Sequence, residues 1–281
     1  MNAHREKPPV IVFSSHVAHG AVGNRAVVFA LERLGFPVVA VPTIVLAWHP
    51  GEGQATRIIP PDEEFSGLIG DLVAAPWLGE VGGVLSGYLG DAAQADAIAG
   101  LVRGVKARNP EALYLCDPVV GDDDGVYVSP EILAAIGEEL VPLADIMTPN
   151  RHELSFLRHR DYSNNDELVA AARQSRVAES LITSAFAGHE RTGNLLVAPG
   201  GVYLAEHAAL AGAPHGTGDL VAALYLAHRL DGAEGPAALR LATSSTLRLI
   251  EMASGSPELP LARGQAAFFA PHTGVSLDKV G

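Results

Sequence analysis

The chain has 281 residues, 48% of them apolar, and its 32 acidic and 19 basic side chains give a net charge of −13. This length allows one large α/β domain with a full core, and the acidic balance argues against binding nucleic acid or an anionic membrane, because both need a basic patch. The one cysteine, Cys116, rules out a disulfide framework and fits the reducing cytoplasm, and the sequence shows neither a signal peptide nor an apolar span of roughly 20 residues.

Short apolar runs alternate with helix-length segments along most of the chain, and this alternation predicts buried strands joined by helices. In the first part we expect strands over residues 10–14, 38–41, 83–86 and 113–116, and helices over residues 21–34, 62–75 and 91–108. Further along we expect helices over residues 130–140, 151–157 and 167–177, and strands over residues 145–148 and 180–184. The Gly- and Pro-rich segment 48–54 predicts a loop, within a flap that spans residues 44–60.

The pattern changes after residue 190. Apolar runs at residues 195–198 and 202–205 flank Pro199-Gly200-Gly201, which predicts an antiparallel hairpin, and helices are expected at residues 219–229 and 236–252. Repeated strand–helix alternation predicts an α/β fold, with a mostly parallel sheet, helices on both faces, and the hairpin at one edge. No repeat, low-complexity segment or linker divides the chain, so we expect residues 1–281 to form a single domain.

Polar residues directly follow several of the expected strands. They are Ser15 and His16, Ser86 to Tyr88, Asp117, Asn150, and Thr183 with Ser184. In open parallel sheets, ligands bind at the carboxyl ends of the strands. We therefore expect these side chains to meet at one rim of the sheet and to form the binding site.

The strongest local signal is Gly216-Thr217-Gly218-Asp219, directly before the apolar segment 220–224. Glycines at the start of a helix leave backbone N–H groups bare, and the helix dipole adds partial positive charge, so the turn predicts a hole for a phosphoryl group in transit. Asp219 would accept a hydrogen bond from an attacking hydroxyl and take its proton late in the transfer. The alternative from these four residues is that Asp219 only caps the helix.

Other catalytic patterns are missing from the sequence. No Gly-Lys-Ser/Thr follows the glycines, as a Walker loop requires, and no Gly-x-Gly-x-x-Gly follows the first strand, as dinucleotide sites require. The scattered histidines lack the spacing of zinc ligands. Covalent catalysis has little support, because Cys116 lies inside an expected strand and no Gly-x-Ser-x-Gly elbow is present.

Acidic residues form a second cluster. Asp117 and Asp122 follow one expected strand, and Asn150 and Glu153 open the helix after another. Hard oxygen ligands suit Mg²⁺, which needs only one or two carboxylates besides water and phosphates. We therefore expect Asp117, Asp122 and Glu153 to bind magnesium, with turn and helix-capping chemistry as the alternative.

These motifs occur together in a specific order. They are Ser15-His16-Val17, Gly23-Asn24-Arg25-Ala26, Val84-Leu85-Ser86-Gly87-Tyr88, Cys116-Asp117-Pro118-Val119, residues 142–150 with Glu153, Ile182-Thr183-Ser184 and Gly216-Thr217-Gly218-Asp219. With them, over residues 10–255, the chain resembles the pyridoxal kinases of the ribokinase superfamily. Each stretch is short, and the set is specific because all of the stretches occur in order.

The resemblance implies a ribokinase-like fold and the transfer of phosphate from MgATP to the 5′-hydroxymethyl group of pyridoxal, pyridoxine or pyridoxamine. Asp219 matches the catalytic base of the family, and Gly216, Thr217 and Gly218 match its anion hole. Further matches are Asp117, Asp122, Asn150 and Glu153 around the ATP phosphates and magnesium, Thr183 and Ser184 at the nucleotide, and Ser15, Val22, His49, Tyr88 and Tyr127 around the vitamer. Members are usually homodimers, and a monovalent cation such as K⁺ often assists.

One region departs from the family pattern. Where the family carries a stretch like Gln-Phe-Ser-Asn-His-Thr-Gly-Tyr, this chain has Val45-Leu46-Ala47-Trp48-His49-Pro50-Gly51-Glu52. Trp48 and Pro50 thus replace an asparagine and a threonine, and Pro50 has neither a hydroxyl nor an N–H. Because two donors are lost beside the expected substrate, a kinase for another hydroxymethyl heterocycle, such as hydroxymethylpyrimidine, remains an alternative. The third interpretation is a non-catalytic protein that binds B6 vitamers or pyridoxal 5′-phosphate.

Overall fold

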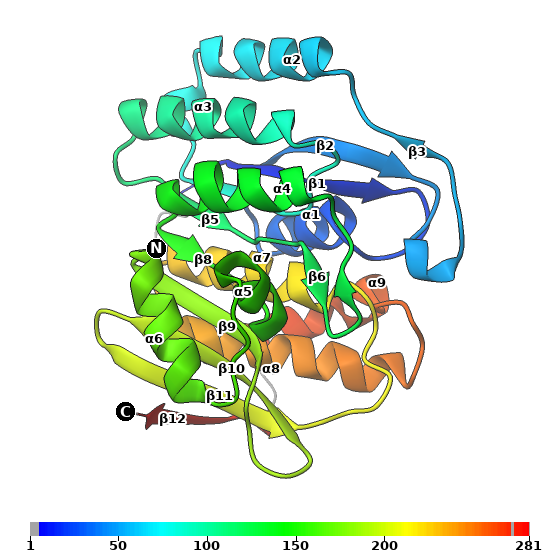
Figure 1. Cartoon of the computed structure of the whole chain (residues 1–281), viewed down its shortest axis with the longest axis vertical. Coiled ribbons are helices and arrows are strands. Elements are labelled where there is room, and N and C mark those ends of the chain that lie inside the picture. The colour runs from blue at the N-terminus through cyan, green and yellow to red at the C-terminus, as the bar shows by residue number, and fades with distance from the viewer. Residues whose placement is uncertain (1–5, 271–272, 281) are drawn as a thin grey trace.

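The computed structural model describes residues 6–270 and 273–280. Its centre is a ten-stranded sheet with the order β12-β11-β10-β9-β8-β5-β4-β1-β2-β3 (Figure 1). The strands are β1 (Val10–Val17), β2 (Val38–Leu46), β3 (Arg57–Ile58), β4 (Gly83–Ser86), β5 (Leu113–Cys116), β8 (Ile146–Met147), β9 (Glu179–Ala185), β10 (Arg191–Ala198), β11 (Gly201–Ala208) and β12 (Ser276–Val280). A separate small hairpin pairs β6 (Gly121–Asp122) with β7 (Gly125–Val126).

The middle of the sheet is parallel. Strands β2, β1, β4, β5, β8 and β9 pair in this order and in the same direction, so their carboxyl ends share one rim. Antiparallel strands continue both edges: β3 pairs with β2, while β10, β11 and β12 extend the sheet beyond β9. The predicted fold class is therefore confirmed, including the late hairpin at one edge.

Alternate residues of β1 face opposite layers of the molecule, which explains its continuous apolar sequence. Val10 and Val12 pack into one hydrophobic core, whereas Ile11 and Phe13 pack into the other, and all four side chains are fully buried. A strand that is covered on both faces requires apolar residues at every position. The sequence therefore shows a short apolar run here, with no polar alternation.

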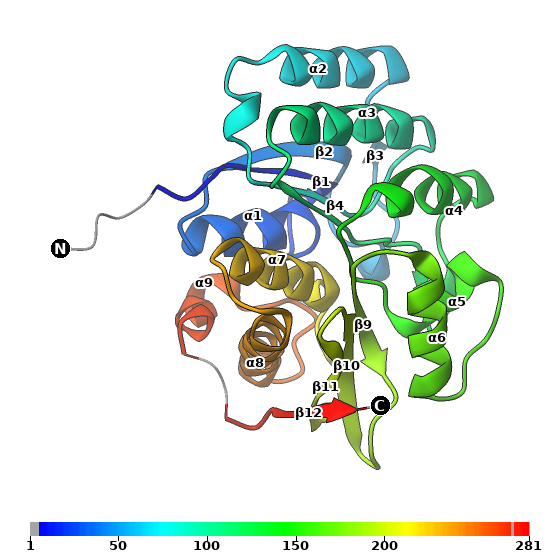
Figure 2. The same ribbon diagram turned by 90° about the vertical axis from the view of Figure 1, so that its left-hand side faces the viewer.

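Helices cover both faces of the sheet (Figure 2). One face carries α1 (Asn24–Arg33), α7 (Thr217–Leu230), α8 (Gly235–Ala253) and α9 (Leu261–Gly264). The opposite face carries α2 (Asp62–Ala74), α3 (Ala93–Arg108), α4 (Pro130–Ala135), α5 (Arg151–Arg158) and α6 (Asn165–Ser175). In the part of the chain that the structure describes, none of these helices is both long enough and apolar enough to cross a membrane.

All of the expected helices and strands are present, with shifted ends. α4 continues to Leu140 as a π-helical turn, and β1 and β2 run on past their predicted ends to Val17 and Leu46. The segment 44–60 is thus only partly a loop, because β2 and the unpredicted β3 occupy its two ends. We use the term flap below for the connection between them, residues 47–56.

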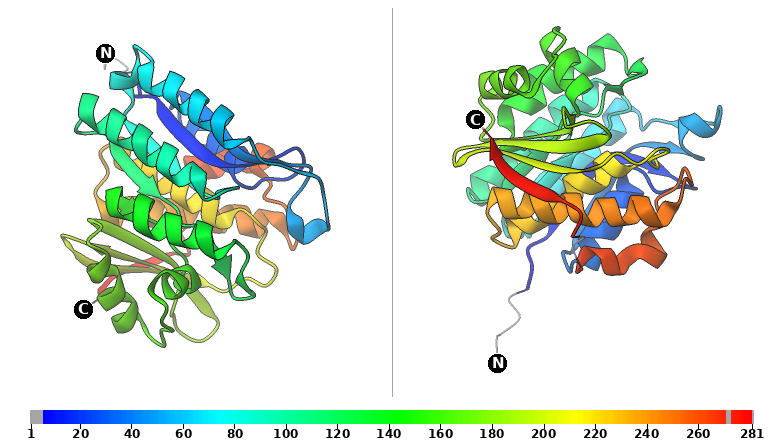
Figure 3. Two further views of the ribbon diagram at one scale, coloured as in Figure 1. Left: turned by 45° about the horizontal axis from the view of Figure 1, so that its top comes forward. Right: turned by 90° about the horizontal axis from the view of Figure 1, so that it is seen from below.

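The sequence analysis missed the shortest elements and the last strand. β6 and β7 have two residues each, which is too short for an apolar pattern to develop. β12 lies along the outer edge of β11 (Figure 3), pairing Val202 with Val280 and Ala205 with Leu277. It has only two apolar residues, because an edge strand buries little of its surface.

Candidate active site

The carboxyl ends of four neighbouring strands are joined by main-chain hydrogen bonds just past the sheet. Asp117, after β5, donates its N–H to the carbonyl of Ser86 at the end of β4 (2.8 Å). Thr183 in β9 donates its N–H to the carbonyl of Pro149 after β8 (2.9 Å), and Asn150 bridges to Thr183. The polar residues that follow β4, β5, β8 and β9 therefore converge on one rim, as predicted.

The glycine turn packs tightly against the loop between β1 and α1. Gly216 has φ of 86° and begins α7 as its N-cap, and a Cβ at this position would lie 2.2 Å from the carbonyl oxygen of Ala21. Only glycine allows both this conformation and this approach. The turn is thereby fixed directly beside Val22, one of the residues predicted to contact substrate.

Asp219 does not cap its own helix. It is the third residue of α7, where the N-cap is Gly216, and its carboxylate accepts a hydrogen bond from the backbone N–H of Gly23 in the opposite loop. The capping interpretation of Asp219 is therefore wrong. The carboxylate is held by a second segment, the loop between β1 and α1, and the residue is partly exposed.

The start of α7 presents bare backbone N–H groups. The first main-chain bond of the helix runs from Leu220 to the carbonyl of Gly216, so the N–H groups of Thr217, Gly218 and Asp219 have no acceptor within the helix. A Cβ added to Gly218 would meet nothing within 4 Å. This open space and the positive end of the helix dipole fit an anion.

Two neighbouring carboxyl groups at the rim resist ionisation. Asp117 is 4% exposed, and it accepts a hydrogen bond from the hydroxyl of Thr148 (2.8 Å between Oγ1 and Oδ1). Burial, and secondly the negative charge of Asp219, raise the pKa of Asp117 to about 8. Burial also raises the pKa of Asp219 to about 6, against the opposing effect of the Gly23 N–H. A cation bound at the rim would compensate the negative charge of these groups and favour their ionisation.

Asn150 and Glu153 form a capping box at the start of α5. The Asn150 side chain accepts hydrogen bonds from the N–H groups of His152 and Glu153 (both 2.8 Å), and Glu153 Oε2 accepts the Asn150 N–H (2.7 Å). Glu153 Oε1 also accepts the N–H of Val120 (3.2 Å). Helix capping is thus confirmed for this pair. Burial, followed by the charge of Asp117, raises the pKa of Glu153 well above its usual range.

The third predicted metal ligand stands apart. Asp122 is exposed at the end of β6, and its Oδ1 accepts the N–H of Asp124 (2.9 Å). Across residues 6–270 and 273–280, no three His, Cys, Asp or Glu side chains lie close enough together to hold a metal ion. Asp122 therefore lies outside any preformed group of ligands among the described residues, and the predicted binding of magnesium by Asp117, Asp122 and Glu153 stays a prediction. The two buried carboxyl groups, Asp117 and Glu153, still fit a magnesium ion that takes its other ligands from water and phosphate.

Replacing Asp117 by Asn is expected to stabilise the ligand-free protein at alkaline pH. The folded pKa of about 8 lies above the ordinary value of 3.8, so the folded state binds more protons than the unfolded chain between these values, and the free energy of unfolding falls as the pH rises through this window. Asp117→Asn removes this loss, and we expect a gain on the order of 5 kcal/mol at pH 8 but little at pH 4. Urea unfolding of both proteins across this range measures the difference, and parallel profiles would contradict the assignment.

The residues predicted to contact substrate lie around the same turn. Ser15 is buried, and a Cβ on Gly23 would lie 2.3 Å from its Oγ, so the hydroxyl is next to the residue that binds Asp219. Val22 belongs to a small apolar cluster against which Tyr88 packs. Ser15, through Gly23, and Val22, through Gly216, thus lie next to the two segments that carry Asp219 and its hydrogen-bond donor.

Two tyrosines pack together beside the apolar cluster that contains Val22. The rings of Tyr88 and Tyr127 lie 6.4 Å apart between centroids with 26° between their planes. Arg57 of β3 donates a hydrogen bond to the Tyr88 hydroxyl (3.2 Å). These three residues line an open hollow of about 470 Å³ beside α4. Tyr127 follows the short β6–β7 hairpin in the chain, and the fold places its ring against that of Tyr88.

The flap reaches the glycine turn through His49. Its ring stacks on the ring of His215, the residue directly before Gly216, with 4.0 Å between the ring centroids. The structure therefore places His49 at the edge of the predicted anion hole. Thr183 and Ser184 lie at the end of β9, and Ser184 is exposed with φ of 53°.

Four residues that position this site were not predicted as members of it: Gly23, Arg57, Thr148 and His215. Gly23 and Thr148 lie inside the motifs that carry the resemblance, so their presence was visible but their hydrogen bonds were not. Arg57 and His215 follow no pattern, because each meets its partner only through the folding of distant segments.

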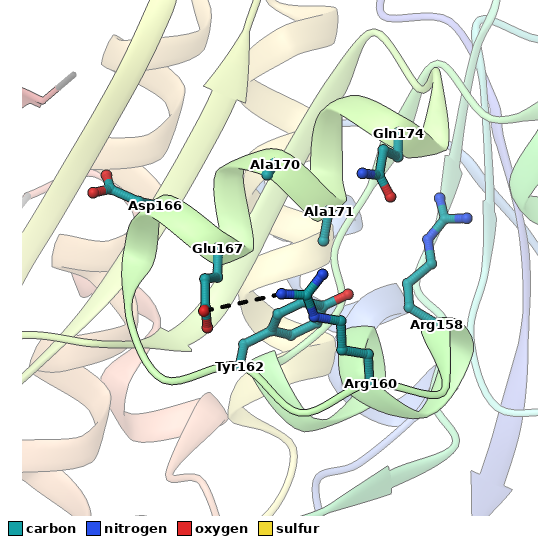
Figure 4. Close-up of a pocket in the computed structure, with 8 residues that line it drawn as sticks. All are labelled: Arg158, Arg160, Tyr162, Asp166, Glu167, Ala170, Ala171 and Gln174. Atoms are coloured by element: carbon teal, nitrogen blue, oxygen red, sulfur yellow. Dashed lines mark ion pairs between the residues drawn. The ribbon is translucent and has the colours of Figure 1, made fainter.

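A second hollow lies away from the rim (Figure 4). It has a volume of about 480 Å³ between the end of α5 and α6, and none of its lining residues is a predicted site residue. Its lining holds two arginines and two acidic residues, so their charges balance, and Arg160 lies 4.0 Å from Glu167 (Figure 4). The lining of this hollow contains neither a helix N-terminus without a side-chain cap nor a buried carboxyl group, both of which the rim has. The rim is therefore the candidate active site.

Comparisons with known proteins agree with this geometry. The family model for phosphomethylpyrimidine kinase matches residues 79–259. Pyridoxal kinase PdxY of Rubrobacter xylanophilus is 35% identical over 277 residues, covering 93% of this chain and 94% of that protein. The pyridoxine/pyridoxal/pyridoxamine kinase of Bordetella pertussis is 36% identical over 262 residues, covering 90% and 93%.

A solved structure shows the same fold over nearly the whole length. Pyridoxal kinase from Leishmania donovani in complex with ADP and pyridoxamine superposes with a TM-score of 0.90, 26% sequence identity, and coverage of 98% of this chain and 100% of that chain. Both sequence relatives exceed 30% identity over nine tenths of the chain, and the fold agrees throughout. The chain therefore belongs to the pyridoxal kinase family.

Proposed function

We propose that the chain is an ATP-dependent kinase that phosphorylates the 5′-hydroxymethyl group of pyridoxal, pyridoxine or pyridoxamine. The observation that carries the proposal is the Asp219 carboxylate, which Gly23 holds at the start of an open glycine turn, with Ser15 next to Gly23 and Val22 next to Gly216. The names of the relatives, and the vitamer bound in the Leishmania donovani enzyme, support the choice of substrate.

The chemistry follows from this arrangement. The transferred γ-phosphoryl group would lie at the N–H groups of Thr217, Gly218 and Asp219, which donate to the charge that develops on its oxygens. Asp219 would accept a hydrogen bond from the attacking hydroxyl and orient it in line. The O–P bond forms as the bond to ADP breaks, and the hydroxyl proton passes late to Asp219. Asn150, Thr183 and Ser184 would contact the nucleotide from the neighbouring strand ends.

Magnesium fits the buried acidic rim. Asp117 and Glu153 would hold the ion, through water or directly, together with the ATP phosphates, and the ion would supply the positive charge that these carboxyl groups and the phosphates need. A monovalent cation such as K⁺ would add to the same neutralisation. The raised pKa values of both residues support the presence of a cation during catalysis.

Release of ADP in a coupled assay tests the proposal. MgATP is offered with pyridoxal, pyridoxine, pyridoxamine or hydroxymethylpyrimidine, and Asp219→Asn serves as the control for transfer by this site. Turnover of a B6 vitamer that is lost in the variant would support the proposal. Binding of vitamers without any ADP release would favour a non-catalytic binding protein.

Hydroxymethylpyrimidine, or its phosphate, is the second candidate substrate. Two observations favour it: the family model that matches residues 79–259 describes phosphomethylpyrimidine kinase, and the flap carries Trp48 and Pro50 where vitamer kinases usually carry hydrogen-bonding residues. Turnover of the pyrimidine alcohol with none of the vitamers would select this function.

Ser15→Ala is expected to raise the KM for the vitamer while changing kcat little. The buried Ser15 hydroxyl lies next to Gly23, the residue that binds Asp219, and loss of one hydrogen bond to a bound ring costs about 1 kcal/mol, or roughly fivefold in KM. Steady-state kinetics at saturating MgATP measure the effect. An unchanged KM would remove Ser15 from the substrate site.

We further propose that the chain acts in the cytoplasm as a homodimer. The unpaired outer edge of β3 and the exposed apolar side chains of Ile58 and Ile59 support a self-association surface. The one cysteine, Cys116, is a buried free thiol, which suits a reducing compartment.

A further inference from the structure

The flap meets the glycine turn through a close packing of two histidine rings. His49 and His215 lie face to face, with 4.0 Å between the ring centroids and 23° between the planes. Gly51 closes the contact, because a Cβ there would lie 3.0 Å from His49 Nδ1 and 3.2 Å from His215 Nε2. A side chain at residue 51 would crowd both rings, so glycine favours the close packing of the stack.

A hydrogen bond fixes the orientation of the flap histidine. The N–H of Gly51 donates to His49 Nδ1 (3.1 Å), which requires a lone pair on Nδ1 and leaves the proton of the neutral ring on Nε2. Burial, and secondly the neighbouring His215, lower the pKa of His49, while Glu52 and Asp122 act in the opposite direction. The neutral ring that results can stack on a second imidazole without charge repulsion.

The backbone of His215 is hydrogen-bonded to the segment after α8. Its main-chain N–H donates to the carbonyl of Pro257 (3.0 Å), and the residue forms a β-bridge with Glu258. The next residue, Gly216, is wedged against Ala21. The ring that faces the flap is therefore tied on one side to the α8 segment and on the other to the phosphate-binding turn.

We propose that His215 is a positioning residue whose ring holds His49, and with it the flap, closed over the reacting phosphoryl group. This inference rests on the proposed function. The stack links the flap to the glycine turn, so full closure depends on the turn having its phosphate-binding shape. Closure excludes water, and the stack thereby favours transfer to the alcohol over hydrolysis. In hydrolysis, a water oxygen bonds to the γ-phosphorus as the bond to ADP breaks, which gives ADP and inorganic phosphate.

Kinetics of three variants test the role of the ring. His215→Ala is expected to raise the KM for the vitamer about 3- to 10-fold, as expected for an aromatic contact, and to raise the ratio of inorganic phosphate to phosphorylated vitamer. His215→Phe keeps a flat ring and should restore both values, while the backbone anchor to Pro257 is the same in all variants. His159→Asn, which removes an exposed imidazole at the end of α5, should behave as the unmodified protein. An unchanged His215→Ala enzyme, or equal defects in the Ala and Phe variants, would overturn the proposal.

A fluorescence measurement tests the contact without using activity. The chain has two tryptophans, and Trp48, next to His49, donates its indole N–H to the carbonyl of Gly53 inside the flap (3.2 Å). In a Trp77→Phe background, His215→Ala should increase the quenching of Trp48 by acrylamide, and His49→Ala/His215→Ala should increase it no further than either single change. If vitamers are not phosphorylated but Trp48 responds in this way, the proposed function fails and the stack stands. An active enzyme in which Trp48 does not respond overturns the stack alone.

Discussion

Asp219→Asn is expected to lower kcat for the vitamer by about 10²- to 10⁴-fold. Asn keeps the shape of the side chain and can still accept the Gly23 N–H through its carbonyl oxygen. The amide cannot take the proton of the attacking hydroxyl. Its nitrogen is also a donor at the position where the carboxylate has a second acceptor oxygen. The KM values for ATP and vitamer should change much less than kcat, because the loss falls on the transition state. Product formation with saturating substrates, followed by chromatography of the phosphorylated vitamer, measures the loss.

The pH profile provides the control for this assignment. The carboxylate must be ionised to act, and its pKa in the ligand-free protein is about 6, so kcat/KM should fall as the pH is lowered through this value. In Asp219→Asn, the residual kcat/KM should not show this fall on the acidic side of the profile, its acidic limb. A variant that keeps near-normal turnover, or that keeps the acidic limb, would mean that another group accepts the proton.

Gly216→Ala is expected to destabilise the protein and to remove most of its activity. A methyl group would meet the Ala21 carbonyl oxygen at 2.2 Å, and alanine at φ of 86° is strained even without that contact. Relief requires the turn to move away from the loop that carries Gly23, and this movement separates Asp219 from its donor. We expect a loss of about 2–4 kcal/mol in the free energy of unfolding, measured by urea denaturation, with a fall in kcat beyond that of Ser15→Ala.

Gly218→Ala is the matched control, two residues along the same turn. Its φ is not positive, and a Cβ there would meet nothing within 4 Å in the ligand-free protein. The free energy of unfolding should therefore stay within about 0.5 kcal/mol of the original, whereas the KM for ATP should rise because the methyl group occupies the space of the phosphate. Equal destabilisation by both substitutions would show that the close approach at Gly216 is not what fixes the turn.

Local sequence patterns predicted most of the elements and the rim of the sheet. The buried parallel strands have continuous apolar runs, and the residues that follow them must lie at one edge whatever the details of packing. The same logic placed Asp117, Asn150 and Thr183 together. The hydrogen bond between Asp219 and Gly23 could not be derived in this way, because it joins segments that are far apart in the chain.

The separation of Asp122 from the buried carboxyl groups has a local cause. Asp117 and Asp122 are close in sequence, but the backbone turns into the β6–β7 hairpin between them, and Asp122 ends exposed with its carboxylate on Asp124. Asn150 and Glu153 form a capping box with both of its hydrogen bonds present. Glu153 thus caps the start of α5 and also belongs to the buried acidic rim. Proximity in sequence was therefore a poor guide to proximity in the fold.

The last strand to be synthesised completes the sheet. β12 covers the outer edge of β11, so until residues 276–280 have left the ribosome, β11 presents an unpaired row of backbone N–H and C=O groups. A variant that lacks residues 276–280 would expose this strand edge, which could then pair with another copy.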